Sequence, residues 1–225
     1  DRVASRGLGD VYKRQFPDYY DGRGGIAQWD ILNDDWGADV LPSGQVDRVT
    51  AYQTSNGEMW ISWGENKLDL YAQNNSLIGS WDSDDGLEFP IREIVEFNNE
   101  VLFATEEGIA RYDPATNSWL STWEEGNGLP NNAGEEIYEL WTNGIDLVVG
   151  GGDGSSWQGF QGGAISHWNG ASWNVFTSQG QGGILGGYPI TMAECGGLVN
   201  VGIYDANGGI EQLDLASSTI TGTFT

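Results

Sequence analysis

The chain has 225 residues, with 35 glycines, 11 tryptophans, 6 prolines and a formal net charge of −24. This composition excludes collagen-like and proline-rich disordered chains, and no apolar run reaches the ~18 residues of a membrane-spanning helix. We expect no nucleic-acid partner, because a strongly acidic chain repels phosphate backbones, and one Cys and one His exclude a disulfide framework or a Cys/His zinc cluster.

The first residues differ in composition from the rest of the chain. Four of the nine basic residues lie among the first 15. The string at 9–15, GDVYKRQ, resembles translated sequencing-adapter DNA, and a native basic arm is the alternative. We predict that residues 1–24 are a non-native or disordered N-terminal segment outside the fold.

A repeat of about 42 residues follows this segment. An apolar or aromatic anchor recurs at spacings of 42, 41, 56 and 45 residues, at Trp29, Tyr71, Tyr112, Trp168 and Leu213. Each full unit contains four apolar runs separated by Gly, Asn, Asp and Pro turns. In the third unit the runs are Ile109–Tyr112, Trp119–Trp123, Ile137–Trp141 and Ile145–Val149. The intervals leave no room for crossover helices, so antiparallel meanders are expected.

These units predict an all-β chain with the repeat pattern of a β-propeller built from four-stranded antiparallel blades. The fifth unit stops after two strands, so about four and a half blades are expected, and the chain is interpreted as a fragment of a larger propeller with further blades. A closed four-bladed ring with a spare hairpin is the alternative. The predicted propeller covers 25–225, with blades at 25–65, 66–107, 108–162 and 163–208 and a partial blade at 209–225.

The third unit carries a family resemblance. The string Ala110–Trp119, followed by Gly126–Asn132, resembles the repeats of two-component-regulator propeller domains, and Asp85-Gly86-Leu87 repeats part of that signature. Kelch repeats are the second choice, with Gly150-Gly151 in the place of the kelch glycine pair. The first resemblance implies a non-enzymatic sensor or binding domain that is extracellular, on the cell surface or periplasmic. The alternative is a fragment of a propeller enzyme, a quinoprotein dehydrogenase or polysaccharide lyase, whose catalytic residues lie in missing blades.

The sequence offers no convincing catalytic residue. Cys195 matches Phe97 and Trp141 of the sister units, so we expect it to be a small buried apolar residue. His167 lies at a position that varies among the units, and no orienting partner is visible. We therefore predict a structural role for it and no catalytic site.

The densest run of carboxylates follows the second strand of the second unit. Asp82, Asp84, Asp85 and Glu88 are the candidate cation ligands, for Ca²⁺, although they miss the spacing of an EF-hand. We expect no other cofactor.

The predicted topology also locates a binding surface. In a meander the loops between strands two and three leave the sheet at the same end as the loops between blades. Most acidic turns fall at that end, and so does an insertion with Asp153, Trp157 and Phe160. We hypothesise that this acidic loop face binds a glycan by aromatic stacking, a protein or a cation. The alternative is a solvated acidic surface, as in proteins adapted to saline water.

Overall fold

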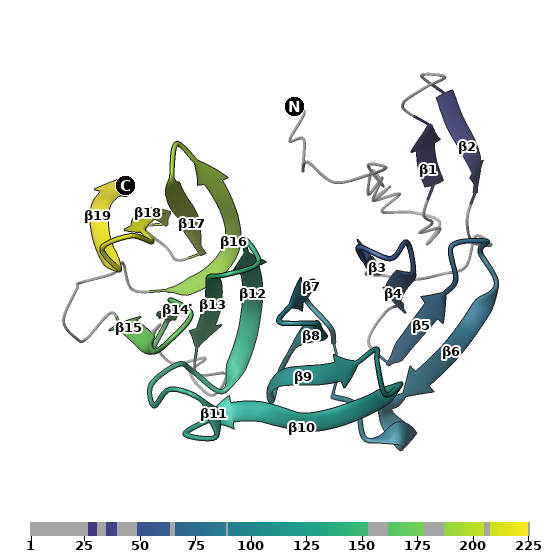
Figure 1. The fold of residues 1–225 in the computed structure, drawn as a ribbon. Coiled ribbons are helices and arrows are strands. Elements are labelled where there is room, and N and C mark those ends of the chain that lie inside the picture. The colour runs from purple at the N-terminus through teal and green to yellow at the C-terminus, as the bar shows by residue number, and fades with distance from the viewer. Residues whose placement is uncertain are drawn as a thin grey trace. The chain divides into compact units, whose positions relative to one another are not determined.

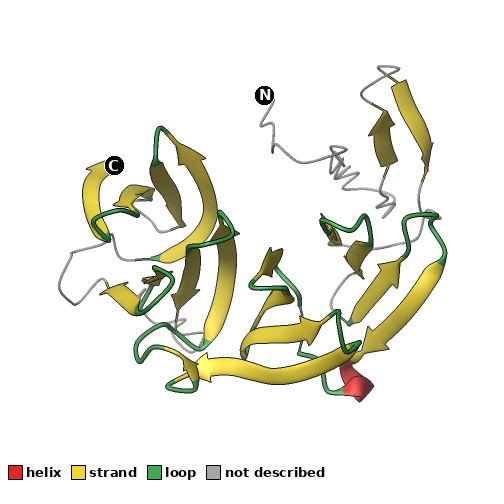
Figure 2. Ribbon diagram, viewed as in Figure 1, coloured by secondary structure: helices red, strands yellow, loops and turns green. Residues whose placement is uncertain are grey.

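The structure is a computed structural model that describes residues 27–30, 35–39, 49–63, 66–88, 90–152, 162–177, 187–204 and 208–224. These ranges are built from β-strands and one short 3-10 helix (Figure 1, Figure 2). The prediction of an all-β chain is confirmed. The predicted N-terminal segment at 1–24 lies outside the described residues. The chain divides into two compact units, Asp1–Pro90 and Ile91–Thr225.

The first unit contains two antiparallel sheets. A two-stranded sheet pairs β1 (Ala27–Asp30) with β2 (Asp35–Asp39). A four-stranded sheet follows in chain order, with β3 (Val49–Gln53), β4 (Met59–Trp63), β5 (Lys67–Tyr71) and β6 (Leu77–Asp82). Side chains alternate between its faces: Met59 and Ile61 pack with Ala51, whereas Trp60 stacks on Trp81 at a centroid distance of 5.4 Å. The 3-10 helix η1 (Ser83–Asp85) follows β6.

The second unit contains three sheets, each built from four consecutive strands, with a short fifth strand on the first sheet. The first sheet has β7 (Ile94–Phe97), β8 (Glu100–Thr105), β9 (Gly108–Asp113) and β10 (Ser118–Glu125), with β11 (Gly128–Leu129) parallel to the end of β10. The second has β12 (Glu136–Thr142), β13 (Leu147–Gly152), β14 (Ala164–Trp168) and β15 (Trp173–Thr177). The third has β16 (Tyr188–Cys195), β17 (Leu198–Tyr204), β18 (Gly209–Asp214) and β19 (Thr219–Phe224).

Two apolar cores lie between the sheets of the second unit. Strand β12 contacts β8 on one side and β16 on the other, so its sheet is in the middle (Figure 1). Ile109, Ile137 and Leu147 are fully buried in the first core, and Val199 and Leu213 in the second. Fully burying one such side chain is worth about 1.5–3 kcal/mol, so these cores hold consecutive sheets face to face.

The repeat period is found in the structure, but the sheets group the strands differently from the predicted blades. Predicted blade 66–107 joined β5 and β6 to β7 and β8, which belong to different sheets. The predicted boundary before Gly108 falls inside a hairpin, because Gly108 pairs with Thr105 across the two-residue turn Glu106-Glu107. Polar and glycine residues occupy hairpin turns and inter-sheet connections alike. Turn composition therefore predicted the length of the repeat, but the predicted blade boundaries are displaced by two strands from the observed sheets.

Two apolar residues are more exposed than expected. Ile145, predicted to begin a strand, lies in the turn before β13 and is 70% exposed. Cys195, predicted to be buried, is exposed at the end of β16. The equivalent Phe97 of β7 is covered by the sheet that follows it, whereas no further sheet follows β16–β19 in the described part of the chain. The prediction for Cys195 was therefore wrong because burial at this position depends on the neighbouring sheet.

Candidate functional site

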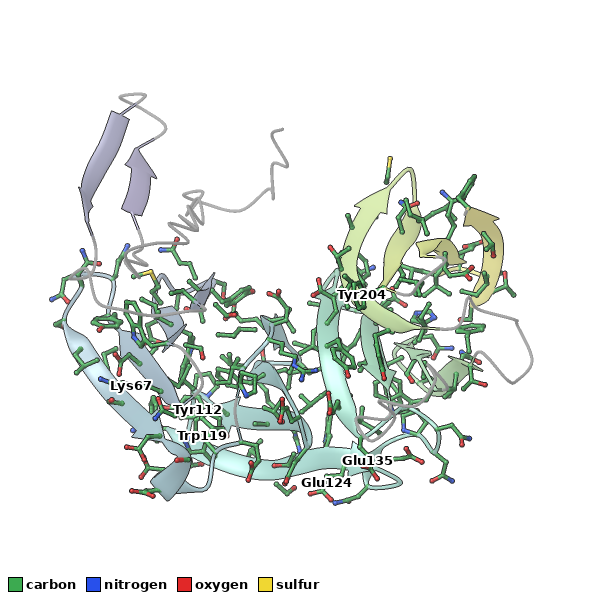
Figure 3. All side chains as sticks on the ribbon, turned by 180° about the vertical axis from the view of Figure 1, so that it is seen from behind. Lys67, Tyr112, Trp119, Glu124, Glu135 and Tyr204 are labelled. Carbon is green, nitrogen blue, oxygen red and sulfur yellow. The ribbon has the colours of Figure 1, made fainter. Side chains whose placement is uncertain are left out.

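Acidic turns of the second unit leave its sheets at one end. The turn Glu106-Glu107 joins β8 to β9, and the connection from Glu124 to Glu135 runs from β10 toward β12. In an antiparallel meander both connections emerge at the same end, which we call the loop end. Figure 3 labels Glu124 and Glu135 at this end.

Arg92 ties two sheets together at the loop end. Its Nη2 donates to Oε1 of Glu106 at 3.0 Å and to Oε2 of Glu136 at 3.1 Å. Its guanidinium lies 4.2 Å from the ring centre of Tyr138. The Arg92 side chain is only 15% exposed, so solvent screens these contacts less than it would at an open surface. Glu106 belongs to the first sheet and Glu136 to the second.

Two tyrosine rings continue this group toward the third sheet. The Tyr138 hydroxyl donates to Oε2 of Glu136 at 2.7 Å, and its ring lies 4.9 Å from that of Tyr188. Burial, and then the hydrogen bond to Glu136, raise the pKa of Tyr138, so the hydroxyl remains a donor. Tyr188 pairs across strands with Tyr204, which is 60% exposed. We name Arg92, Glu106, Glu136, Tyr138 and Tyr188 the Arg92 cluster.

Glycine at the end of β13 lets these rings pack closely. A Cβ on Gly152 would lie 2.6 Å from a ring carbon of Tyr188 and 3.4 Å from one of Tyr138. Gly152 belongs to the insertion at 150–162 that was predicted to bind a ligand. Its candidate residues Asp153, Trp157 and Phe160 lie outside the described residues.

Glu106 and Glu136 belong to the predicted acidic loop face, whereas Arg92, Tyr138 and Tyr188 were not among the sequence-based candidates. One available signal was the rarity of cations, because Arg92 is one of five basic residues after residue 15 in a chain with 33 acidic residues. A cation in such a chain has many potential partners, and the repeat alone did not indicate which carboxylates it meets.

The predicted cation ligands lie in the first unit, around η1. Oδ1 of Asp82 accepts from the amide of Asp84 at 2.9 Å, and Oδ2 of Asp85 accepts from the amide of Asp82 at 3.0 Å. Gly86 closes the turn with a φ of 80°. These two carboxylates therefore cap the turn, and Glu88 follows it as an exposed side chain. Among the described residues, no three His, Cys, Asp or Glu side chains are grouped to hold a metal ion.

A buried carboxylate in the first unit was also missed from the sequence. Asp69 of β5 is 3% exposed. Its Oδ2 accepts from Nε1 of Trp63 at 2.9 Å and from the Tyr71 hydroxyl at 3.2 Å, while Nζ of Lys67 lies 3.6 Å from Oδ1. Burial, followed by the nearby charge of Asp69, raises the pKa of Tyr71 to about 12.

His167 has the orienting partner that the sequence did not show. It is fully buried in β14. Its Nε2 lies 2.8 Å from Oδ1 of Asp146, in the turn between β12 and β13, and its Nδ1 lies 3.1 Å from Oγ of Ser218, in the turn between β18 and β19. The hydrogen bonds of His167 therefore join the second and third sheets of the unit.

Comparison with solved structures identifies the architecture. A chain in the crystal structure of the Mitotic Checkpoint Complex aligns with a TM-score of 0.62 and 13% identity, over 89% of this chain and 58% of that chain. The fold is a β-propeller. The computationally designed Ika4 protein aligns with a TM-score of 0.53 and 13% identity, over 79% of this chain and 98% of that one. At such identity the likeness shows the propeller fold alone.

The propeller therefore has the four-stranded sheets as its blades. No protein-family model and no curated protein matches the chain, so the resemblance to two-component-regulator or kelch propellers stays a prediction. Within the described residues there is no helix with the length and apolar character needed to cross a membrane.

Proposed function

We propose that this propeller is a binding protein that recognises a neutral glycan at the loop end of its second unit. The observation that carries the proposal is the Arg92 cluster, in which two tyrosine rings lie beside carboxylates that an arginine holds in place. Tyrosine rings pack against the apolar faces of sugars, and carboxylates accept strong hydrogen bonds from hydroxyl groups. The proposed extracellular, cell-surface or periplasmic location suits such a ligand.

The charge of the chain narrows the ligand class. A net charge of −24 disfavours acidic polysaccharides as well as nucleic acids. Tyr204 and Glu106, which are 60% and 46% exposed, are open to a ligand. Arg92 forms ion pairs with Glu106 and Glu136. It therefore holds two carboxylates in place as hydrogen-bond acceptors for sugar hydroxyl groups, and we do not propose it as an anion-binding residue.

A basic protein segment is the second candidate ligand. One structural neighbour is a chain of the Mitotic Checkpoint Complex, a protein assembly. The acidic turn Glu106-Glu107 and the acidic end of β10, Glu124-Glu125, would attract positive charge. The two candidates differ in salt dependence. Binding to a basic segment should weaken steeply with ionic strength, whereas stacking on a neutral sugar should not.

The test is a screen of neutral, acidic and basic glycans and of basic peptides, followed by calorimetric titration at two salt concentrations. We expect Tyr204→Ala and Glu106→Gln each to weaken binding about tenfold, which corresponds to ~1.4 kcal/mol. Ile145→Ala is the matched control, because Ile145 is 70% exposed at the opposite end of its sheet. Unchanged affinity in both loop-end variants would contradict the proposal. Trp157→Ala and Phe160→Ala test separately whether the insertion takes part.

A further inference from the structure

Three residues meet between the last two blades, at the end of the sheets opposite to the loop end. Asp146 lies in the turn between the first and second strands of its blade, and Ser218 in the turn between the third and fourth strands of the next. His167 lies between them and is fully buried. The three side chains form a continuous hydrogen-bonded chain, Asp146 to His167 to Ser218.

Ser218 departs from the repeat. Its φ is 49°, and Asn75 and Asn117 occupy the matching left-handed turn position in other blades, with φ of 63° and 54°. Asparagine tolerates this backbone region well, whereas serine adopts it less readily. His167 also departs from its repeat, since Leu70 and Gln212 stand at the equivalent position.

The turn itself does not require a serine at 218. Asp214 accepts from the amide of Ala216 at 2.9 Å, as Asp113 does from that of Ala115 at 2.9 Å in the first blade of the unit. The hydroxyl pair that closes the turn is also repeated. Asn117 uses its side chain within its own sheet, as acceptor for the Tyr112 hydroxyl. Ser218 instead reaches the histidine of the neighbouring blade.

The two partners of His167 favour one neutral tautomer of its imidazole. An ionised carboxylate can only accept hydrogen bonds, so Asp146 orients His167 with the proton on Nε2. The lone pair of Nδ1 then faces the hydroxyl of Ser218 at 3.1 Å. A hydroxyl within hydrogen-bond reach of a base, which a third group orients in turn, is the arrangement of an activated nucleophile.

We propose that Ser218 is a nucleophile for carboxylic esters, with His167 as its general base and Asp146 as a positioning residue. Ser218 Oγ forms a bond to the ester carbonyl carbon while its proton passes to Nδ1 of His167. The C–O bond to the alcohol then breaks, and the alcohol leaves with that proton. Water attacks the acyl-serine, gives one proton to Nδ1, and releases the carboxylic acid as the proton returns to Ser218. This activity is independent of the proposed glycan binding.

A fluorophosphonate probe tests the nucleophile in the native protein. The probe forms an Oγ–P bond and releases fluoride, and peptide mass spectrometry locates the label. We expect Ser218 to react at least 100-fold faster than the neighbouring exposed Ser217, which is the scale of general-base assistance. Because both serines are read in one folded sample, no variant needs to fold for this comparison. Equal labelling of the two serines, or none at Ser218, would overturn the proposal.

Variants then separate the roles of the three residues. Ser218→Ala should lose the label and Ser217→Ala should keep it, while His167→Gln should slow labelling at Ser218 by at least 100-fold. His167 is the only histidine, so imidazole ¹⁵N NMR reads this one ring. We expect a proton on Nε2 in the wild type and a mixture of tautomers in Asp146→Asn, with slower labelling. A wild-type proton on Nδ1 would make Ser218 a hydrogen-bond acceptor and refute the mechanism.

Discussion

Arg92 and Tyr138 donate to the same atom, Oε2 of Glu136, while the guanidinium of Arg92 lies 4.2 Å from the centre of the Tyr138 ring. The three side chains therefore fix one another, and the carboxylate of Glu106 is drawn in through the same nitrogen of Arg92. Because these residues come from two blades, the group contributes to the packing between blades as well as to the candidate site.

Replacing Arg92 should destabilise the second unit. Arg92→Met leaves the half-buried carboxylates of Glu106 and Glu136 without their cation, and we expect a loss of about 2–3 kcal/mol in the free energy of unfolding. Urea denaturation at pH 7 measures it. Arg111→Met is the matched control: this arginine is also 15% exposed, binds Glu100 through two nitrogens and lies 4.5 Å from the Trp123 ring, but within one sheet. An equal loss of unfolding free energy in Arg111→Met would show that the contact between two blades gives Arg92 no additional stabilising effect.

Stability should fall between about pH 10 and pH 12 because of Tyr71. Its pKa is raised from 10.0 to about 12 in the folded chain. Below pH 10 the phenol is protonated in both states, so the shift has no effect. Between the two values the unfolded state releases the proton and the native state retains it, so unfolding is favoured as the pH rises. We expect Tyr71→Phe to lose less stability than the wild type between about pH 10 and pH 12, as measured by urea denaturation.

The cause of that shift can be tested on the neighbouring carboxylate. Asp69→Asn removes a charge and a charged hydrogen-bond acceptor while burial remains, so the pKa of Tyr71 should move part of the way back toward 10.0. The titration is followed by absorbance at 295 nm in two proteins, Asp69→Asn and the double variant Asp69→Asn with Tyr71→Phe. The difference between the two curves gives the pKa of Tyr71. An unchanged pKa would mean that burial alone raises it.

Gly151→Ala should be much more damaging than Gly144→Ala. A Cβ on Gly151 would lie 2.1 Å from the carbonyl oxygen of Ala133, which is backbone and cannot turn away. A Cβ on Gly144 meets nothing within 4 Å, and its only cost is the positive φ of 91°. We expect a loss of about 1 kcal/mol for Gly144→Ala and of about 3 kcal/mol or more for Gly151→Ala, read from denaturant midpoints. Similar losses would argue against the close approach at Gly151.

Cys195 should react with a thiol reagent in the native protein. It is exposed at the end of β16, and it is the only cysteine in the chain. We expect Ellman's reagent to modify one thiol at nearly the rate seen in denaturant. A native rate slower by a factor of 100 or more would indicate that this face of the last blade is covered in solution.

The fold could be predicted from the sequence because its signal is repeated. The anchors near Tyr71, Tyr112 and Trp168 all lie at the ends of third strands, and four alternating runs per period indicate a blade. The residue composition of the turns does not indicate where a blade starts. Glu106-Glu107 closes a hairpin, while Glu124-Glu125 opens a connection to the next sheet, and both are pairs of glutamates.

The candidate sites could not be predicted in the same way, because their residues depart from the repeat. Arg92 meets Glu136 across 44 positions, and His167 meets Ser218 across 51. Such contacts depend on how one blade faces the next, which a period does not specify. Conversely, the carboxylates of Asp82 and Asp85 looked like cation ligands because a dense acidic run and a capped turn have the same composition.

Every complete blade is made from one uninterrupted stretch of chain, such as Glu136–Thr177, and its strands pair with their neighbours in order. Except for the hairpin of β13 and β14, which carries the insertion, the ends of each hairpin meet after only a few residues, so the entropy lost on closing the loop is small. Low contact order of this kind favours fast formation of single blades. Opening should likewise proceed in cooperative units that match the sheets. Native-state hydrogen exchange should therefore give one common opening free energy for β12–β15 and a distinct, lower one for β16–β19, because within the second unit β12 contacts both β8 and β16, whereas the last sheet packs on one neighbouring sheet.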